Sequence, residues 1–336
     1  VDLSFIMSEL AELAKMAKRI NDFALGKYFS RVIKAPISKN TEINVPFHPF
    51  GISAQSRGKE LLLKFFPKED NAERAENEVK CEQANFSPLY LLMTMGLHGF
   101  WRFNKAKKSR KEEPKYTLLT FLAEDGTKMM HGDKLRFSKW KFVNGFSSNR
   151  GPDPTQEFDG FVENIAQAFK SNRSLKTFEK PIGEVLLNQK YFNGIGNYLR
   201  SEILYRANIH PLEIAHNALL VTEPIDSDAK RPFILPPTDE FDFRNSIILK
   251  LCNSFCEEMK QASFLGKRVL MKAYNRSNAS NFKDNNNRTV WYYKTQQFVI
   301  EPENMAEQLA NLTPRRPRSR KRKSSVTKEP PKKRQK

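Results

Sequence analysis

The chain has 336 residues, which is long enough for two domains with separate hydrophobic cores. It carries 57 Lys and Arg against 38 Asp and Glu, a formal net charge of +19. Such a balance favours a polyanionic partner, with nucleic acid ahead of an acidic membrane surface. No apolar run has the length of a membrane span and no signal peptide is recognisable, so we expect no membrane insertion.

The three cysteines, Cys81, Cys252 and Cys256, favour an intracellular, reducing compartment. Cys252 and Cys256 lie one turn apart on a helical stretch, which predicts thiols packed in a core. No group of cysteines and histidines has the spacing of a zinc site. We therefore expect neither a metal nor a small-molecule cofactor.

The first part of the chain is predicted to be a β-sandwich with a leading helix. The helix covers residue 8 to about residue 27, with Ser8 as its N-cap and Glu9 in its first turn. Strands are expected at residues 31–35, 52–55, 60–66, 89–95, 99–103 and 116–122, near 129 and around 136–142. Asp125-Gly126 is a hairpin turn signal between two of these strands.

The second part changes to a helical pattern after a linker rich in Gly, Pro, Ser and Asn at residues 144–156. Helices are expected at residues 161–169, 182–190, 197–206 and 239–262, then a hairpin over 283–300 that turns at 284–287, and a short helix over 306–312. The fold class is therefore α+β. The expected domains are residues 1–146, 147–264 and 265–312, followed by a disordered basic tail at 313–336.

The tail concentrates positive charge. Residues 314–336 hold 12 basic residues and one acid, a contribution of +11 that leaves +8 on the body of the chain. The basic clusters at 321–323 and 332–334 favour nuclear import, so we expect the protein in the nucleus. Added electrostatic attraction to DNA and a merely solvating tail are the alternatives.

Residues 189–206, QKYFNGIGNYLRSEILYR, form the most informative stretch. Two apolar helical runs flank a break that contains Gly194 and Gly196, which allow a sharp turn and let another molecule approach the backbone closely. Asn197 opens the second helix, where its amide can cap the first N–H groups and still present a donor outward. Bare N–H groups behind a glycine turn predict a phosphate site. The same residues also suit an ordinary helical hairpin with a glycine turn.

The string from Asn193 to Arg200 resembles the helix–two-turn–helix motif of the formamidopyrimidine-DNA glycosylase and endonuclease VIII family, in particular its animal endonuclease VIII-like branch. The resemblance extends from about residue 7 to residue 293. It implies an N-terminal β-sandwich, a helical DNA-binding domain and a finger. It also implies a base-excision-repair DNA glycosylase with AP lyase activity on oxidised bases, mainly pyrimidines.

The resemblance assigns DNA contacts to several positions. Asn197, with Gly194 and Gly196, would grip the DNA backbone beside a damaged base. Residues 288–291, RTVW, resemble the β-hairpin finger that replaces a zinc finger in this branch, and Arg288 would contact a phosphate near the lesion. Taken without the resemblance, Arg288 is an exposed charge on a hairpin.

Three family side chains fill the void that a flipped base leaves. Leu97 and Phe137 fall on two of these positions, although both also suit the core of a sandwich. The third position, usually arginine, is Leu135 here, with Arg136 beside it.

The catalytic positions implied by the resemblance are Ser8, Glu9 and Lys59. The family begins Met-Pro-Glu-Gly-Pro-Glu and attacks the sugar with the amine of the proline, whereas the matching run here is MSELAE, with Ser8 at the proline position. Glu9 and Glu12 match the two family glutamates. Lys59, in the segment ISAQSRGKEL, falls on the family's catalytic lysine, although by itself it is a basic residue beside a glycine turn.

The nucleophile depends on how the chain starts. If synthesis starts at Met7 and the methionine is removed, Ser8 carries a free α-amine with a pKa of about 8, which can attack C1′ and form a Schiff base. Glu9 would then act as the acid that protonates the ring oxygen, and Lys59 would assist. With residues 1–7 attached, the nitrogen of Ser8 is an amide and is not nucleophilic.

Two other functions stay open at this level. One is a DNA-damage-binding protein of the same fold that has lost its nucleophile, and the other is a general nucleic-acid-binding module. Glu9, Glu12 and Lys59 favour the enzyme, because a protein that only binds DNA needs no such set. Damaged DNA is the expected partner and the protein is expected to be a monomer, whereas the sequence does not tell which proteins it binds.

Overall fold

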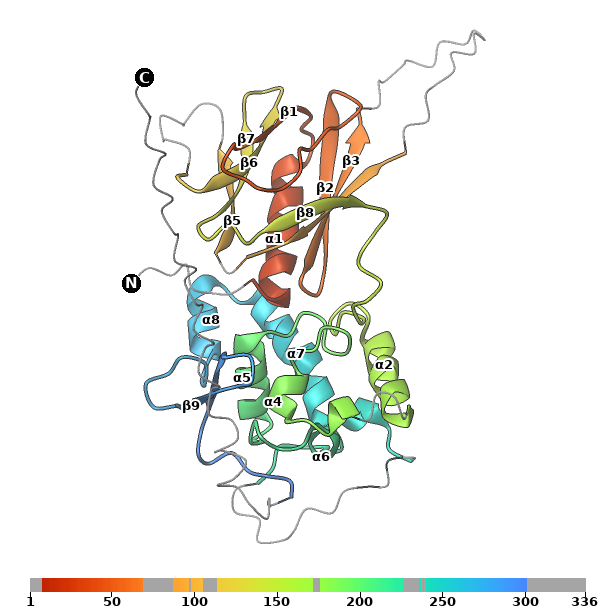
Figure 1. Ribbon diagram of the computed structural model, residues 1–336, viewed down its shortest axis with the longest axis vertical. Helices are drawn as coiled ribbons and strands as arrows, with labels where there is room; N and C mark the ends of the chain where they lie inside the picture. Colours follow the sequence, from red (N-terminus) through yellow and green to blue (C-terminus); the bar gives the residue numbers. More distant parts are fainter. Residues whose placement is uncertain are drawn as a thin grey trace, which may run out of the picture.

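The computed structural model describes residues 8–68, 87–96, 98–104, 114–171, 176–226, 236, 238 and 240–300. Two halves are stacked along the long axis, with β-strands in one and most of the helices in the other (Figure 1). Cys81, Leu97, the expected helix at 306–312 and the basic tail at 313–336 lie outside the described residues.

The strands of the first half form one antiparallel sheet, which in the described part of the chain has eight strands in the order β5-β7-β6-β1-β2-β3-β4-β8. Their bounds are β1 Phe29–Lys34, β2 Phe50–Arg57, β3 Glu60–Pro67, β4 Leu89–Thr94, β5 Gly99–Asn104, β6 Thr117–Ala123, β7 Lys128–Asp133 and β8 Lys139–Val143. Asp125 and Gly126 lie in the turn between β6 and β7, as expected, and Gly126 has a φ of 76°.

This sheet is folded over on itself. β1 and β2 pair only at Phe29 and Phe50, so the described strands separate into two four-stranded halves. The halves face each other, because the His131 ring of β7 lies 6.3 Å from the Trp140 ring of β8, at opposite ends of the strand order. The predicted β-sandwich is therefore confirmed.

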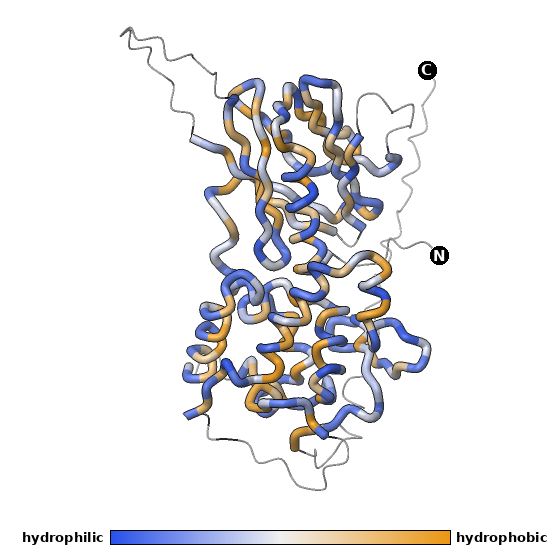
Figure 2. The backbone as a smooth tube through the Cα atoms, turned by 180° about the vertical axis from the view of Figure 1, so that it is seen from behind, coloured by the Kyte–Doolittle hydropathy of each residue, from blue (hydrophilic) through white to orange (hydrophobic). Residues whose placement is uncertain are grey.

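Helix α1 (Leu10–Ala24) joins the two hydrophobic cores. Leu13, Ala17 and Ile20, spaced on one helical face, pack in the sandwich core, whereas Leu10 and Ala11 pack with the helical core. Hydrophobic stretches run through both halves in Figure 2, consistent with two cores. Because Glu9 precedes Leu10, it lies where the two cores meet.

The second half is built from short helices and a hairpin. The elements are α2 Phe158–Lys170, α4 Ile182–Val185, α5 Asn197–Arg206, α6 Ala215–Leu219, the 3-10 helix η2 Phe243–Asn245, α7 Ile247–Gln261, α8 Phe264–Leu270, β9 Ser280–Lys283 and β10 Thr289–Tyr292. Helix α5 begins and ends at the residues that the sequence predicts. Cys252 and Cys256 are buried free thiols of α7, and burial raises the pKa of both, so the expectation of core thiols is confirmed.

Two predicted helices are too long. Instead of residues 182–190, α4 ends at Val185, because the Asn188 side chain accepts a hydrogen bond from the Lys190 N–H (3.1 Å) and competes with the helix. The last long helix starts at Ile247 rather than at 239, since the Asp242 carboxylate accepts from the Arg244 N–H and starts the separate element η2.

Three further details also differ from the predictions. The strand expected over 136–142 starts only at Lys139, since the Asp133 carboxylate holds the preceding residues in a loop in which Arg136 has a φ of 59°. The hairpin spans Ser280 to Tyr292 rather than 283–300, although its turn lies where expected. Helix α8 was not predicted, and the expected domain boundary at 264/265 falls inside it.

Candidate active site at the junction of the two halves

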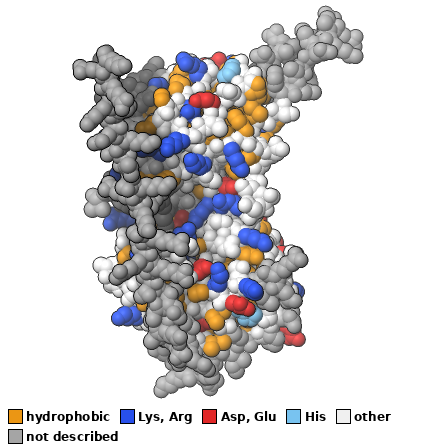
Figure 3. Space-filling view, in the orientation of Figure 1, with side chains coloured by type: hydrophobic (Ala, Val, Ile, Leu, Met, Phe, Trp, Pro, Cys, Tyr) orange, Lys and Arg blue, Asp and Glu red, His pale blue; other side chains and the backbone are white. Residues whose placement is uncertain are grey.

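A cavity of about 660 Å³ lies between the sandwich and the helical half. Its lining comes from the start of α1, the β2–β3 turn, the loop before β8, the turn before α5 and the β9–β10 hairpin. The lining includes seven of the positions that the sequence singled out: Ser8, Glu9, Lys59, Phe137, Gly196, Asn197 and Arg288. Lys and Arg side chains lie on the visible face of both halves and at the waist between them (Figure 3).

The carboxylate of Glu9 caps the N-terminus of α5. It accepts hydrogen bonds from the N–H groups of Gly196 (2.9 Å), Tyr198 (3.1 Å) and Leu199 (3.2 Å). The residue is buried, and burial raises the pKa of Glu9 to about 7, against the opposing effects of Lys59 and the backbone donors. Both protonation states of this carboxyl are therefore populated near neutral pH, as a general acid requires.

This cap corrects two predictions. Ser8 is not the N-cap of α1, because the helix begins at Leu10 and its N-cap is Glu9. Asn197 makes no capping hydrogen bond to α5, whose N-cap is Gly196. The N–H groups that the sequence assigned to a phosphate are not bare, since a side chain 187 residues away in the sequence occupies them.

Lys59 lies beside Glu9. Its Nζ donates to the carbonyl of Ile195 (2.9 Å), in the turn before α5. Burial lowers the pKa of Lys59, Glu9 opposes this, and the nearby positive charges of Arg150, Arg288 and Arg200 lower it further. The pKa shifts of Glu9 and Lys59 bring both groups closer to their neutral forms, which suits proton transfer between them and a bound substrate.

Two glycines allow this packing. A Cβ at Gly196 would lie 2.1 Å from Glu9 Oε1 and 2.5 Å from Lys59 Nζ. Gly194 has a φ of 97°, and a Cβ there would lie 2.8 Å from the Cβ of Leu10. The sequence predicted the turn correctly, but it assigned the close approach to another molecule. Both glycines are buried, and the groups that approach them come from the N-terminal half of this chain.

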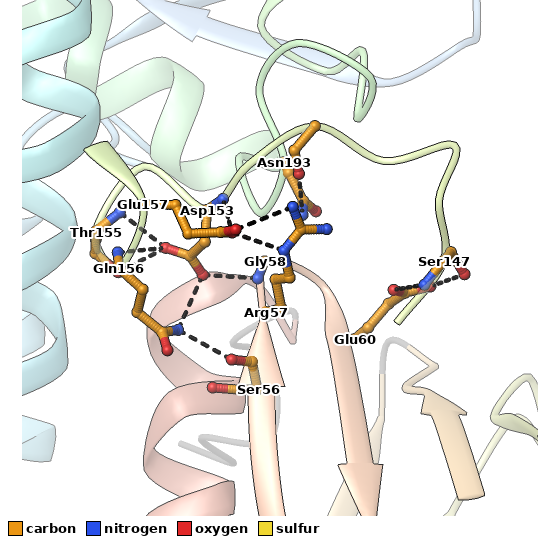
Figure 4. Close-up of polar contacts among 11 residues, drawn as sticks. Ser56, Arg57, Gly58, Glu60, Ser147, Asp153, Thr155, Gln156, Glu157 and Asn193 are labelled. Carbon is orange, nitrogen blue, oxygen red and sulfur yellow. Dashed lines mark hydrogen bonds and ion pairs between the residues drawn. The ribbon is translucent and has the colours of Figure 1, made fainter. Parts of the chain in front are cut away.

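The β2–β3 turn that carries Lys59 is fastened to the linker between the two halves (Figure 4). The N–H of Gly58, which has a φ of 56°, donates to the Asp153 carboxylate over 2.7 Å. Beside it, Arg57 Nε donates to Glu157 over 2.6 Å. These contacts fix the position of the turn relative to α5, and therefore the position of the Lys59 side chain in the cavity.

The residue after Lys59 is fastened as well. Glu60 is buried and accepts hydrogen bonds from the Ser147 N–H (3.1 Å) and Oγ–H (2.6 Å), and it forms an ion pair with Arg150 at 3.1 Å. Lys59 is thus held from both sides, which limits the movement of its backbone.

Ser8 lines the cavity directly before Glu9. Its hydroxyl donates to the Gly96 carbonyl at 3.5 Å, the long end of the hydrogen-bonding range. In the sequence as printed, the Ser8 nitrogen is joined to Met7 and is therefore an amide. The structure places Ser8 in the lining of the same cavity as Glu9 and Lys59.

Asn197 and Arg288 lie on two different elements of the lining. The Asn197 amide donates to the carbonyl of Thr289 over 3.0 Å, so the start of α5 is bonded directly to the hairpin. Arg288 is exposed in the turn between β9 and β10, and its guanidinium makes no hydrogen bond or ion pair with the described residues. Arg288 is therefore available to an external anion.

Phe137 belongs to the surface rather than to the sandwich core. It is 61% exposed and lines the cavity, in a loop held by hydrogen bonds from the Phe137 and Ser138 N–H groups to the Asp133 carboxylate. Arg136 and Leu135 are not among the residues that line this cavity; together with Phe137 they line a second cavity of about 350 Å³.

Sequence reasoning missed several side chains that organise this site. Arg200 and Asp284 form a buried ion pair of 2.9 Å between α5 and the hairpin. Gln189 bonds to the Ile195 carbonyl (2.9 Å) and accepts from the Gly194 N–H (3.0 Å). The one available signal was Arg200 itself, a charged residue in the middle of helix α5, most of whose residues are buried.

The described residues contain no group of three or more His, Cys, Asp or Glu that could hold a metal ion. None of the helices that the structure describes has the length and apolar character needed to cross a membrane.

The chain is similar to known proteins. Residues 151–223 match the Formamidopyrimidine-DNA glycosylase H2TH domain. The chain is 30% identical to human Endonuclease 8-like 1 over 96% of this chain and 78% of that protein, and 29% identical to the mouse protein of that name over 85% and 72%. It is 27% identical to Formamidopyrimidine-DNA glycosylase of Arabidopsis thaliana over 62% of this chain and 52% of that protein.

Solved structures share the fold. The crystal structure of Lactococcus lactis formamidopyrimidine-DNA glycosylase non-covalently bound to DNA with an AP site has a TM-score of 0.60 and 14% identity, over 86% of this chain and 99% of that one. A complex of the same enzyme with DNA containing an oxidized pyrimidine has a TM-score of 0.59 and 15% identity, with the same coverage.

Proposed function

Because the chain belongs to the formamidopyrimidine-DNA glycosylase and endonuclease VIII family, we propose that its cavity is the site where a damaged base is excised and the abasic sugar is cleaved. The protein is a base-excision-repair DNA glycosylase with AP lyase activity, and its partner is damaged DNA. The cavity of about 660 Å³ lies within the range of sites that enclose a ligand of nucleoside size.

The observation that carries the proposal is the pairing of Glu9 and Lys59 at the N-terminus of α5. Glu9 has a pKa of about 7, so it can donate a proton to the sugar ring oxygen as the glycosidic bond breaks. Lys59, with a lowered pKa, can take or give a proton in the elimination that follows. A protein that only binds DNA gains nothing from burying this pair.

Ser8 is the proposed source of the nucleophile. A free α-amine at Ser8 would attack C1′, and the base would leave with the bonding electrons. The C1′–O4′ bond would then break, with O4′ taking a proton from Glu9 and the nitrogen losing its own, to give a Schiff base between this nitrogen and the opened sugar. On a site that is already abasic, the amine would add to the C1′ aldehyde and water would be lost. A primary amine forms an imine as proline does. The position of Ser8 beside Glu9, in the same cavity, supports this assignment.

The test is borohydride trapping on DNA that contains an abasic site. Protein that begins at Ser8, or that carries Ser8→Pro at a clean N-terminus, should give a covalent adduct. The 336-residue chain, in which the Ser8 nitrogen is an amide, should give background yield. Equal adduct from both forms would assign the attack to another amine. If neither form gives adduct while tight lesion binding persists, the damage-binding alternative becomes the better one.

For the lesion, we propose oxidised pyrimidines as the main substrate class. A panel of duplexes with one oxidised pyrimidine, one oxidised purine or an undamaged base, matched in sequence, tests this by the initial rate of base release. Faster release of the oxidised purine than of the pyrimidine would contradict it.

For location, we propose the nucleus. The support is the pair of basic clusters at residues 321–323 and 332–334. A fluorescent fusion of the chain should enter the nucleus, and replacing both clusters with glutamine should leave it outside. Unchanged nuclear entry would show that these clusters are not the import signal.

A further inference from the structure

Arg200 is an arginine without exposed surface in the middle of α5. One guanidinium nitrogen, Nη1, donates to Asp284 Oδ2 (2.9 Å) and to the Gly183 carbonyl (2.8 Å). The other, Nη2, donates to Asn197 Oδ1 at 2.6 Å. A single side chain thus contacts both the first residue of α5 and the turn of the β9–β10 hairpin.

Asp284 links Arg200 to the backbone of Arg288. Its Oδ1 accepts from the N–H groups of Asn286 (3.0 Å) and Arg288 (2.9 Å), while its own N–H donates to the Arg288 carbonyl at 3.0 Å. One carboxylate oxygen binds Arg200 and the other shapes the hairpin turn. The backbone of Arg288 is therefore fixed relative to Arg200.

Asn197 closes the network from the other side. Its oxygen accepts from Arg200, and its amide group donates to the Thr289 carbonyl at 3.0 Å. Asn197 and Arg288, which come from elements about ninety residues apart in the sequence, are thus held by one set of side chains.

Stability is a poor explanation for this arrangement. Removing a guanidinium from water is costly, and a buried ion pair is often no more stabilising than apolar residues of the same volume. Moreover, the Nε–H of Arg200 is buried and has no hydrogen-bond partner among the described residues. Such a group is better explained by the geometry that it imposes on its neighbours.

We propose that Arg200 is a positioning residue that sets the spacing between Asn197 and Arg288, so that the two bind neighbouring phosphates of one DNA strand as a unit. This inference rests on the proposed function, since it names how the same site holds its substrate. Without Arg200 the hairpin can shift relative to α5. Arg288 then no longer reaches its phosphate while Asn197 is bound to the neighbouring one.

The experiment is a double-mutant cycle on the full chain with a duplex that contains a stable abasic-site analogue. Arg288→Ala should weaken binding of the parent by about tenfold or more, the loss of a charge-assisted contact. Arg200→Met should weaken it by a similar factor, and adding Arg288→Ala to Arg200→Met should change it less than about twofold. The slope of log affinity against log salt should fall by about 0.9 in all three variants, one phosphate contact.

Arg206→Met is the matched control. Arg206 lies on the same helix, stacks on Phe255 at 4.2 Å and donates to the Leu270 carbonyl, but it does not contact the hairpin. This variant should keep the affinity, the salt slope and the full effect of Arg288→Ala. If it behaves like Arg200→Met, the effect is a general loss of helix packing and the proposal is wrong.

A second variant keeps the test valid if Arg200→Met fails to fold. Arg200→Gln/Asp284→Asn removes both buried charges together, which leaves no uncompensated charge. The melting temperature of this double variant should be close to that of the parent. Adding Arg288→Ala to it should again leave the DNA affinity almost unchanged, because glutamine is too short to bond to Asn197 and residue 284 at once. Additive effects in both cycles would overturn the positioning role. Failure of the parent to prefer the abasic duplex over undamaged DNA would instead contradict the proposed function.

Discussion

The cavity has a buried wall, made of the buried Glu9 and Gly196 with the half-buried Lys59, and an exposed wall, made of Phe137 and Arg288. On the buried wall, desolvation moves the pKa values of Glu9 and Lys59 toward neutrality, and each polar atom has a defined partner. On the exposed wall, Phe137 is 61% exposed and the Arg288 guanidinium is free of partners among the described residues. The first arrangement suits proton transfer and the second suits binding.

The two walls also differ in which part of the chain supports them. The buried wall is assembled from α1, the β2–β3 turn and the turn before α5, so it requires both halves. The exposed charge at Arg288 depends on the hairpin and on its contacts with α5 and α4, all within the helical half. Substitutions on the buried wall should therefore affect turnover and folding, whereas those on the exposed wall should affect affinity.

The largest effect is expected for Glu9→Gln. Loss of a general acid lowers the rate by about 10²–10⁴-fold. The acid must be protonated, with a pKa of about 7, and the Ser8 amine must be neutral, with a pKa of about 8, so the rate of the parent should follow a bell-shaped pH profile with its maximum between about pH 7 and 8. The variant should lose the decline on the alkaline side. Single-turnover rates of base release from pH 5.5 to 9, in protein with a free Ser8 amine, measure both. A variant with the parent rate and the same pH profile would remove Glu9 from the mechanism.

Gly196→Ala should come next. Its methyl group would meet Glu9 and Lys59 at 2.1 and 2.5 Å, so one of them must move, at a cost of about 1–3 kcal/mol in unfolding free energy and a large loss of rate. The matched control is Gly160→Ala in α2, where the nearest atom is a proline side-chain carbon at 3.6 Å. Urea unfolding and turnover should be affected by the first change and not by the second.

Arg288→Ala on the exposed wall and Asn197→Ala at the start of α5 should each weaken lesion-DNA binding by about 1.5–3 kcal/mol, since each would remove one or two of the proposed contacts to phosphate. Arg288→Ala should leave the melting temperature unchanged, because the Arg288 side chain is exposed and its guanidinium makes no hydrogen bond or ion pair with the described residues. Titration of an abasic-analogue duplex, with thermal melts alongside, tests this. Parent-like binding by both variants would place the DNA on another surface.

The smallest effect is expected for removal of residues 314–336. This deletes a charge of +11 but leaves +8 on the body, so binding should weaken mildly, its salt dependence should flatten and lesion selectivity should survive. Affinities for damaged and undamaged duplexes at several salt concentrations would show it. Loss of selectivity in parallel with affinity would mean that recognition extends into the tail.

Much of the fold could be predicted because its signals are local. Alternating and helical patterns located the strands and α1, and Asp125-Gly126 and residues 284–287 located two turns by their own backbone preferences. Helix α5 was located to the residue by the glycine turn before it. The helices that were predicted too long failed where an asparagine or aspartate side chain bonded to a nearby N–H and ended the helical pattern.

The sequence by itself determined the β-sandwich, the helical half and the family membership, since hydrophobic periodicity and the string from Asn193 to Arg200 are readable from neighbouring residues. Only the tertiary structure showed which groups pack against Gly194 and Gly196 and which group binds the start of α5. Glu9 and Gly196 are separated by 187 residues, and no local preference encodes a carboxylate that caps a helix in the other half. That contact exists because α1 packs into both cores, and the same packing moves the Glu9 pKa to about 7.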